Sequence, residues 1–191
     1  SHVVLMGIGE PLDNYDSVMD FLSIVSSPEG VNIGMRNISL STCGLVPGIE
    51  RLAKEKLQLT LSVSLHAPNN AIRSGMMPVN DAYPLEKLMP AVRAYQETTG
   101  RRVSFEYSMV RGVNDSDACA RELAKLIRGM GAHVILIPIN PVDGSPYSAS
   151  DDNNVKRFQA LLTQLGVNAT VRRRLGSEIS AACGQLRREE M

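Results

Sequence analysis

Five apolar runs in the chain each end in polar residues that could hold a ligand. The residues at these ends are Gly7–Pro11 (GIGEP), Ser41–Gly44 (STCG), Ser62–His66 (SVSLH), Glu106 and Pro138–Pro141 (PINP). In parallel α/β folds a ligand binds beyond the carboxyl ends of the strands, so all five segments are candidates for one site. Any one of them alone fits a turn or a helix cap, so the prediction of a ligand site rests on their common position at strand ends.

Glu10 is the first candidate for direct contact with a ligand. Gly9 lets the backbone approach a ligand, and Pro11 pushes Glu10 toward an extended conformation. A carboxylate fixed in this way suits an ammonium group, and a solvated carboxylate in a loop is the competing interpretation. His66 fits a general base or, more commonly, a hydrogen-bonded supporting residue. Glu106 fits either a buried ion pair or a substrate contact.

The cysteine and histidine pattern predicts no metal site made by this chain alone. Cys43, Cys119 and Cys183 lie far apart, and HExxH, GxGxxG and GxxxxGK[ST] are all absent. Cys119 lies among apolar helix residues and is predicted to be structural, whereas Cys183 stands between two small residues and is sterically open. Arginines at 172–174 form a candidate phosphate clamp, although neighbouring strand residues face opposite sides.

Alternating strand and helix patterns must position these residues. Apolar, β-branched runs predict strands at Val3–Ile8, Asn37–Ser41, Leu59–Leu65, Arg102–Met109, Val134–Ile139 and Asn168–Arg174. Helical spacing predicts helices at Asp16–Val25, Gly48–Lys54, Leu85–Gln96, Ser116–Arg128 and Asn154–Leu165, with Asn14, Asp115 and Asp151 as caps. This order implies a parallel sheet buried on both faces. A complete eight-unit barrel needs about 250 residues, so an open sheet, a partial barrel or a fragment is expected.

Composition and charge narrow the class of protein. The chain has 191 residues, of which 43% are hydrophobic and 21% charged, as in a soluble globular domain. Basic and acidic residues number 20 each, and a net charge of zero argues against tight nucleic-acid binding by this chain alone. Residues 101–191 hold 13 Lys/Arg against 10 Asp/Glu, so a polyanion contact favours this half. No membrane span or secretion leader is recognisable, which predicts a cytoplasmic protein.

Five motifs together resemble the radical S-adenosylmethionine (SAM) RNA methyltransferases, which methylate carbon 2 of adenine in 23S ribosomal RNA and, in many members, in transfer RNA. The motifs are Gly7–Leu12 (GIGEPL), Ser41–Gly44 (STCG), Ser64–Ala67 (SLHA), Pro138–Pro141 (PINP) and Ala182–Leu186 (ACGQL). GEP occurs in radical SAM enzymes generally, whereas ACGQL is specific to this methyltransferase group. The match runs through nearly the whole chain.

The resemblance implies a set of SAM-binding residues and a methyl carrier. The residues that would contact SAM are Gly9 and Glu10 at the amino group, Ser41, Ser64, Leu65 and His66 at the ribose and carboxylate, and Asn140 at the adenosine. Cys183 would take a methyl group from one SAM. A second SAM, cleaved reductively at a [4Fe–4S] cluster, would yield the radical that activates this S-methyl group. Carbon 2 of adenine is not nucleophilic, so direct transfer from SAM would fail.

The family's CxxxCxxC cluster loop, resolving cysteine and N-terminal RNA-binding domain do not occur in this chain and would lie upstream of Ser1. We therefore expect an α/β fold, a partial (β/α) radical SAM barrel with parallel strands that lacks the first strand and the cluster loop. Residues 1–170 would form the partial barrel, and 171–191 the C-terminal strand and methyl-cysteine loop of the same domain. The isolated chain would be inactive, and the complete enzyme a monomer reduced by a donor such as flavodoxin.

Three other functions stay open on the sequence. A partial-barrel hydrolase or aldolase would use Glu10, His66 and Glu106 as acid–base groups. A non-catalytic RNA-binding or assembly module would bind RNA by itself. A relative that methylates carbon 8 of adenine would carry similar motifs.

Overall fold

A computed structural model describes residues 2–6, 9–140 and 145–172 of the chain. Its six strands form one sheet in the order β1-β2-β3-β4-β5-β6, the same order as in the sequence. The pairs β1–β2, β2–β3 and β5–β6 are parallel. The expected α/β fold with parallel strands is confirmed.

Helices connect successive strands. The strands are β1 (Val3–Leu5), β2 (Ile38–Thr42), β3 (Thr60–Ser64), β4 (Ser104–Met109), β5 (His133–Pro138) and β6 (Asn168–Val171). The helices are α1 (Tyr15–Ser26), α2 (Val46–Lys54), α3 (Asn70–Met76), α4 (Val79–Ala82), α5 (Leu85–Thr99), α6 (Asp117–Leu126) and α7 (Asp152–Gln164), with a short 3₁₀ helix η1 (Met35–Asn37). The short helices α3 and α4 lie where the sequence pattern predicts no helix.

The chain divides into two compact units that alternate along the sequence. Unit 1 comprises Ser1–Ser64 and Val79–Ser104, and unit 2 comprises Leu65–Pro78 and Phe105–Met191. Unit 1 therefore holds β1, β2 and β3 with α1, α2, α4 and α5. Unit 2 holds most of β4, together with β5, β6, α3, α6 and α7. The expectation that residues 1–170 and 171–191 belong to one domain stays a prediction.

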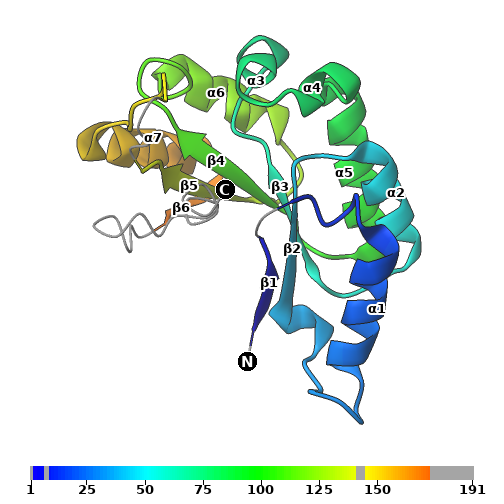
Figure 1. The fold of residues 1–191 in the computed structure, drawn as a ribbon. Helices are drawn as coiled ribbons and strands as arrows, with labels where there is room; N and C mark the ends of the chain where they lie inside the picture. The colour runs from blue at the N-terminus through cyan, green and yellow to red at the C-terminus, as the bar shows by residue number, and fades with distance from the viewer. Residues whose placement is uncertain (1, 7–8, 141–144, 173–191) are drawn as a thin grey trace. The chain divides into compact units, whose positions relative to one another are not determined.

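In unit 1, helices α1, α2 and α5 lie on the same side of β1, β2 and β3 (Figure 1). Leu40 of β2 and Leu61 of β3 are fully buried in the core. Gly48 of α2 lies directly against Leu12, because a Cβ atom added at Gly48 would stand only 2.7 Å from the Leu12 Cβ. The missing side chain lets α2 approach the β1–α1 connection closely, and this connection carries Glu10.

The two faces of β2 and β3 differ in polarity. Successive strand residues face opposite sides, so Ser41 shares one face with its parallel partner Ser62, while Leu40 and Leu61 share the other. Ser41 and Ser62 are 8% and 6% exposed, so this serine face is buried too. The apolar runs in the sequence predict burial on both faces but give no sign that one face consists of small hydroxyl side chains.

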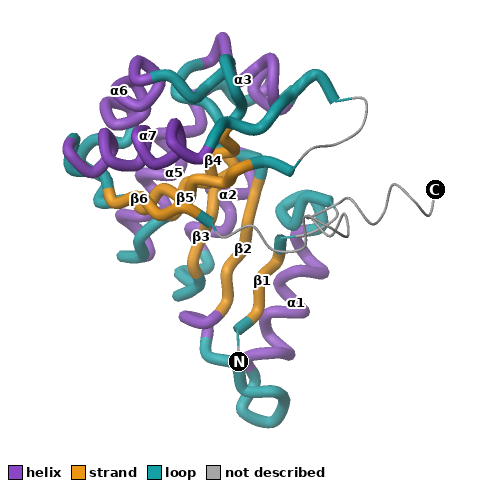
Figure 2. Tube along the Cα trace, turned by 90° about the vertical axis from the view of Figure 1, so that its left-hand side faces the viewer, coloured by secondary structure: helices purple, strands orange, loops and turns teal. Residues whose placement is uncertain are grey.

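In unit 2, α6 packs on α7, and α7 packs on β5 and β6 (Figure 2). The ring of Tyr107 from β4 contacts Phe158 of α7, with ring centroids 5.5 Å apart. Tyr107 is 0% exposed and Phe158 is 1% exposed. These contacts hold α7 against β4, β5 and β6, the strands of unit 2.

The helix caps correct one expectation from the sequence. Asp151 caps α7 as predicted, because its Oδ1 accepts a hydrogen bond from the Asn154 amide at 2.9 Å. Ser116, not Asp115, caps α6 through a bond from the Cys119 amide at 3.2 Å. The Asp115 carboxylate is buried and instead accepts hydrogen bonds from Gly112, Ser150 and Asn154. Asn14 occupies the predicted cap position of α1, but its side chain makes no capping bond.

Among the described residues, none of the helices combines the length and the apolar character that a membrane crossing requires.

Candidate active site

The Glu10 carboxylate joins the ends of two neighbouring strands in unit 1. Its Oε1 accepts a hydrogen bond from the Leu12 amide at 3.0 Å, and its Oε2 accepts one from the Cys43 amide at 2.7 Å. Cys43 directly follows β2, whereas Glu10 follows β1. A carboxylate has about four lone-pair positions, so two remain for a ligand after these bonds. The structure thus provides an oriented carboxylate that can still bind an ammonium group.

Gly9 meets the expected requirement for glycine beside Glu10. Its φ is +103°, a left-handed conformation that residues with side chains rarely adopt, and a Cβ built there would meet no atom of the described residues within 4 Å. The described residues therefore leave the space beside this backbone open, so a ligand can approach the peptide next to the carboxylate.

Ser41 and Ser64 also occupy the carboxyl-terminal parts of their strands in unit 1. Ser41 is the residue before the end of β2, and Ser64 is the last residue of β3. Ser41 is buried and Ser64 is half-buried. Unit 1 therefore brings Gly9, Glu10, Ser41 and Ser64 to the carboxyl ends of three adjacent strands, as the sequence predicts.

The His66 imidazole in unit 2 is fixed by hydrogen bonds. Its Nδ1 accepts a bond from the Ser108 amide at 3.0 Å, so Nδ1 carries no proton and Nε2 carries the ring's N–H. The backbone of His66 has a φ of +56°, in the left-handed region. The His66 amide donates to the Glu106 carbonyl at 3.1 Å, which ties this residue to β4. His66 therefore presents a hydrogen-bond donor at Nε2.

Burial keeps this ring neutral. Desolvation, and to a lesser extent the positive charge of Arg73, together lower the pKa of His66 to about 4. Arg73 is completely buried in α3, and its Nε donates to the Leu65 carbonyl at 3.2 Å. A histidine with this pKa and an occupied Nδ1 is poorly suited to general-base catalysis at neutral pH. This geometry favours the supporting, hydrogen-bonding interpretation of His66.

Replacing His66 by asparagine should leave folding at pH 7 intact and reduce the loss of stability in acid. Asparagine can accept the Ser108 bond through Oδ1, and it tolerates the left-handed backbone. The pKa of His66 is about 4 in the folded chain, against about 6.5 when unfolded, so protons bind preferentially to the unfolded state between these values. The stabilising contribution of neutral His66 is present above pH 6.5 and disappears as the pH falls toward 4.

The expected difference is up to about 2 kcal/mol between pH 7 and pH 5. Thermal unfolding of the wild-type and variant full-length proteins at both pH values measures it. Equal acid sensitivity of the two proteins would show that His66 is not held neutral by the fold.

The remaining candidates divide between described and undescribed parts of the chain. Leu65 is fully buried, and Asn140 is half-buried two residues after β5 ends. Glu106 is 4% exposed within β4, and its backbone carbonyl accepts bonds from Leu65 and His66. Cys183 lies outside the described residues. The prediction that residues of both units surround one ligand stays a prediction.

No metal centre is built from the residues that the structure describes. They contain no group of three or more His, Cys, Asp or Glu side chains that could hold a metal ion. Cys43 is half-buried, and Cys119 is buried in α6, where its sulfur accepts a bond from the Ser116 hydroxyl at 3.2 Å. A [4Fe–4S] cluster therefore finds no ligand set among the described side chains.

Sequence reasoning missed two buried residues that bond to the backbone of the candidate residues in unit 2. Arg73 lies in the unpredicted helix α3, and nothing in the sequence indicates that this arginine is fully buried. Asn114 is also fully buried, and it bonds to the His66 carbonyl from 48 residues away. A turn-forming Asn is readily predicted after a strand, but its long-range partner is not.

A parallel α/β sheet with an oriented carboxylate and other polar residues at its strand ends is typical of partial (β/α) barrel proteins, which bind their ligands at these ends. The model of the radical SAM superfamily matches residues 1–139. The chain belongs to the radical SAM superfamily, as the motifs predict.

Curated relatives have closely similar sequences. A probable dual-specificity RNA methyltransferase RlmN from Desulforudis audaxviator is 55% identical over 98% of this chain and 59% of its own length. Another from Clostridium novyi is 52% identical, over 98% of this chain and 55% of its own length. The chain therefore spans somewhat more than half the length of these relatives.

Solved structures agree with the fold. A radical SAM methyltransferase from Sphaerobacter thermophilus superposes with a TM-score of 0.93 at 50% identity, over 96% of this chain and 54% of that chain. A domain of a pyruvate-formate lyase-activating enzyme from Bacteroides vulgatus has a TM-score of 0.65 at 14% identity and covers 91% of this chain and 99% of that chain, which shows a shared fold alone. The expectation of a partial radical SAM barrel is consistent with both.

Proposed function

We propose that this chain is the SAM-binding part of an RNA methyltransferase that modifies carbon 2 of adenine in 23S ribosomal RNA and in transfer RNA. The observation that carries the proposal is the 55% identity to a probable dual-specificity RNA methyltransferase over 98% of this chain. The ACGQL motif at Ala182–Leu186 supports it, because this motif resembles the methyltransferase group more specifically than the GEP motif does.

In unit 1, the proposed role of Glu10 is to bind the amino group of SAM. The amides of Leu12 and Cys43 hold both carboxylate oxygens, so the charge is oriented before the ligand arrives. Gly9 leaves open space for the ligand beside this charge. Ser41 and Ser64 supply hydroxyl groups from β2 and β3 for the ribose and the carboxylate.

In unit 2, His66 would donate a hydrogen bond to SAM from Nε2 while its ring stays neutral. A neutral donor suits the ribose hydroxyls, and the fixed tautomer prevents the ring from offering a lone pair in its place. Leu65 precedes it and would pack against the ligand. Asn140, after β5, can donate and accept through one amide and would bind the adenosine.

Cys183 would accept the first methyl group. Its thiolate sulfur forms a bond to the SAM methyl carbon as the sulfonium–carbon bond breaks, and S-adenosylhomocysteine leaves. A [4Fe–4S] cluster would supply the electron for cleavage of a second SAM, and the described residues include no ligand set for it. We also propose a flavodoxin-type electron donor, a monomeric complete enzyme and a cytoplasmic location.

Nucleoside analysis of RNA treated with the full-length protein tests the proposed function. The protein is reconstituted anaerobically with iron and sulfide, then supplied with SAM, a reductant and either a 23S ribosomal RNA fragment or transfer RNA. Mass spectrometry should detect 2-methyladenosine in both RNAs. Formation of 8-methyladenosine would assign the chain to the carbon-8 relatives, and an unmodified adenine with an intact cluster would contradict the proposal.

A further inference from the structure

Asn114 is a buried residue that contacts both the backbone of His66 and the strand that fixes its ring. It is 0% exposed and lies in the connection between β4 and α6. Its Nδ2 donates to the His66 carbonyl at 2.7 Å and to the Ser108 carbonyl at 2.6 Å. Ser108 is the residue whose amide binds the His66 Nδ1. The Asn114 side chain therefore binds both residues of the hydrogen bond that fixes the tautomer of the imidazole, His66 and Ser108.

The orientation of the Asn114 amide is fixed by its surroundings. Its Oδ1 accepts a bond from the Val110 amide at 2.8 Å, on the side opposite the two carbonyl groups. A flipped amide would set its oxygen against two carbonyl oxygens and its NH₂ group against an N–H donor. The two N–H groups and the oxygen of this amide therefore find matching partners in only one orientation.

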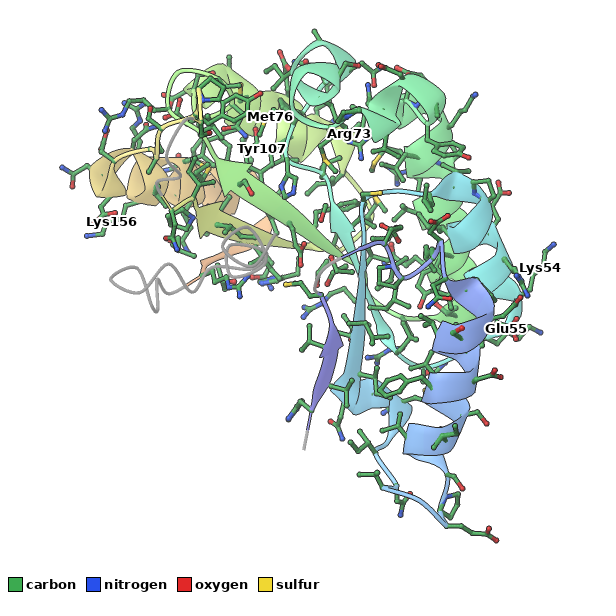
Figure 3. The ribbon with its side chains drawn as sticks, in the orientation of Figure 1. Lys54, Glu55, Arg73, Met76, Tyr107 and Lys156 are labelled. Carbon is green, nitrogen blue, oxygen red and sulfur yellow. The ribbon has the colours of Figure 1, made fainter. Side chains whose placement is uncertain are left out.

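Two further contacts hold Asn114 in place. The Tyr107 hydroxyl donates to the Asn114 backbone carbonyl at 2.8 Å, and Met76 of α3 brings its sulfur within 3.8 Å of Nδ2. Figure 3 labels both side chains, which lie in the same region as Arg73 of α3. A side chain immobilised on all sides can impose a conformation on its partners at little further entropic cost.

The conformation that it imposes on His66 is an unusual one. A φ of +56° is rare for a residue with a side chain, and it persists only when surrounding contacts determine it. The bond from Asn114 to the His66 carbonyl and the bond from the His66 amide to Glu106 hold both sides of this residue. Losing the Asn114 bond would release the backbone toward ordinary φ values and move the ring away from the Ser108 amide.

We propose that Asn114 is a positioning residue for SAM binding, which holds His66 in its left-handed conformation and in the tautomer whose Nε2–H faces the ligand. This inference rests on the proposed function for the role of SAM, but the coupling of Asn114 to His66 does not. Asn114 itself would make no contact with SAM. It acts through the His66 backbone and through the Ser108 amide.

The test replaces Asn114 by serine in the full-length protein labelled with ¹⁵N-histidine. Long-range ¹H–¹⁵N spectra, assigned with the His66→Asn variant, report which ring nitrogen of His66 carries the proton. The wild-type protein should show His66 as the Nε2–H form throughout pH 5.5–8. Asn114→Ser should show a mixture of both tautomers and about tenfold weaker SAM binding, the effect of losing roughly one ordinary hydrogen bond.

Asn154→Ala is the matched control. Asn154 also makes several hydrogen bonds in unit 2, to Asp115 and Ser150, but none to His66 or Ser108. Its replacement should lower the unfolding temperature while the His66 signals and SAM affinity stay unchanged. Equal His66 spectra in wild type and Asn114→Ser would overturn the positioning role.

Two other outcomes separate this proposal from the proposed function. A wild-type His66 that is a tautomer mixture would overturn the positioning role even if the variant fails to fold. A changed tautomer in Asn114→Ser with unchanged SAM affinity would support the coupling of Asn114 to His66 but overturn the role of Asn114 in SAM binding. The same result would overturn the proposed contact between His66 and SAM.

Discussion

Replacing Glu10 by glutamine in the full-length protein is expected to weaken SAM binding on the order of 100-fold, which corresponds to about 3 kcal/mol. Glutamine loses the negative charge that would pair with the ammonium group of SAM. The two carboxylate oxygens of Glu10 now accept hydrogen bonds from the Leu12 and Cys43 amides. In glutamine, an NH₂ group would replace one of these oxygens and face an N–H donor. Charge-assisted hydrogen bonds are roughly twice as strong as neutral ones, so both losses are large.

Equilibrium dialysis with labelled SAM in the reconstituted protein measures this effect. Glu55→Gln is the matched control, because Glu55 is an exposed carboxylate at the end of α2 that accepts a bond from the Tyr15 hydroxyl at 3.2 Å. Its replacement keeps an acceptor oxygen and should leave SAM affinity unchanged.

The result also decides between two roles for Glu10. If Glu10 only joins the ends of β1 and β2, its replacement should lower the unfolding temperature. The protein that remains folded should then keep its SAM affinity. A ligand-binding carboxylate would lower affinity by far more than any change in stability explains. Unchanged affinity in a folded Glu10→Gln protein would remove Glu10 from the SAM site.

The positions of the strand-end residues could be predicted from the sequence because parallel strands impose them. An apolar run of strand length fixes where a strand ends, so its last residues and those directly after it must lie at the carboxyl edge of the sheet. Glu10, Ser41 and Ser64 follow this rule in unit 1. This rule uses only the local pattern of apolar residues and the direction of the chain. Both can be read from the sequence without any knowledge of long-range contacts.

The hydrogen bonds that orient these residues could not be predicted in the same way. The Cys43 amide that holds Glu10 is 33 residues away, and the Asn114 side chain that holds His66 is 48 residues away. Such partners depend on how the elements pack. The Asp115 carboxylate illustrates the same point, because its local position suggests a helix cap whereas its actual partners include Ser150 and Asn154.

Helix α3 shows where periodicity fails. Asn70–Met76 has only seven residues, too few for a clear apolar stripe, and its Arg73 is buried against the Leu65 carbonyl. An arginine at such a position predicts a solvent-exposed face. The cap at Asn69, whose Oδ1 accepts from the Ile72 amide at 3.0 Å, is the one local signal of this helix.

Replacing Cys183 by alanine in the full-length protein should reduce RNA methylation on the order of 1,000-fold or more, because the proposed route passes the methyl carbon through this thiol. Cys183 lies outside the described residues, and its role rests on the ACGQL motif at Ala182–Leu186. Peptide mass spectrometry of the protein purified from cells with intact cluster assembly should find the mass of one added methyl group on Cys183. The purified enzyme would then deliver its first methyl group to RNA from this store.

Cys119→Ala is the matched control for this loss. Cys119 is buried in α6, where its sulfur accepts a bond from Ser116, so its replacement changes packing but no reacting group. It should cost about 1 kcal/mol of stability or less and leave methylation intact. If Cys183 remained unmethylated throughout while the wild-type protein still formed 2-methyladenosine, the methyl carbon would have to reach adenine without passing through this sulfur. An isotope test then decides the matter, because a methyl group stored on Cys183 before purification must appear in the first RNA product even when all added SAM carries a deuterated methyl group.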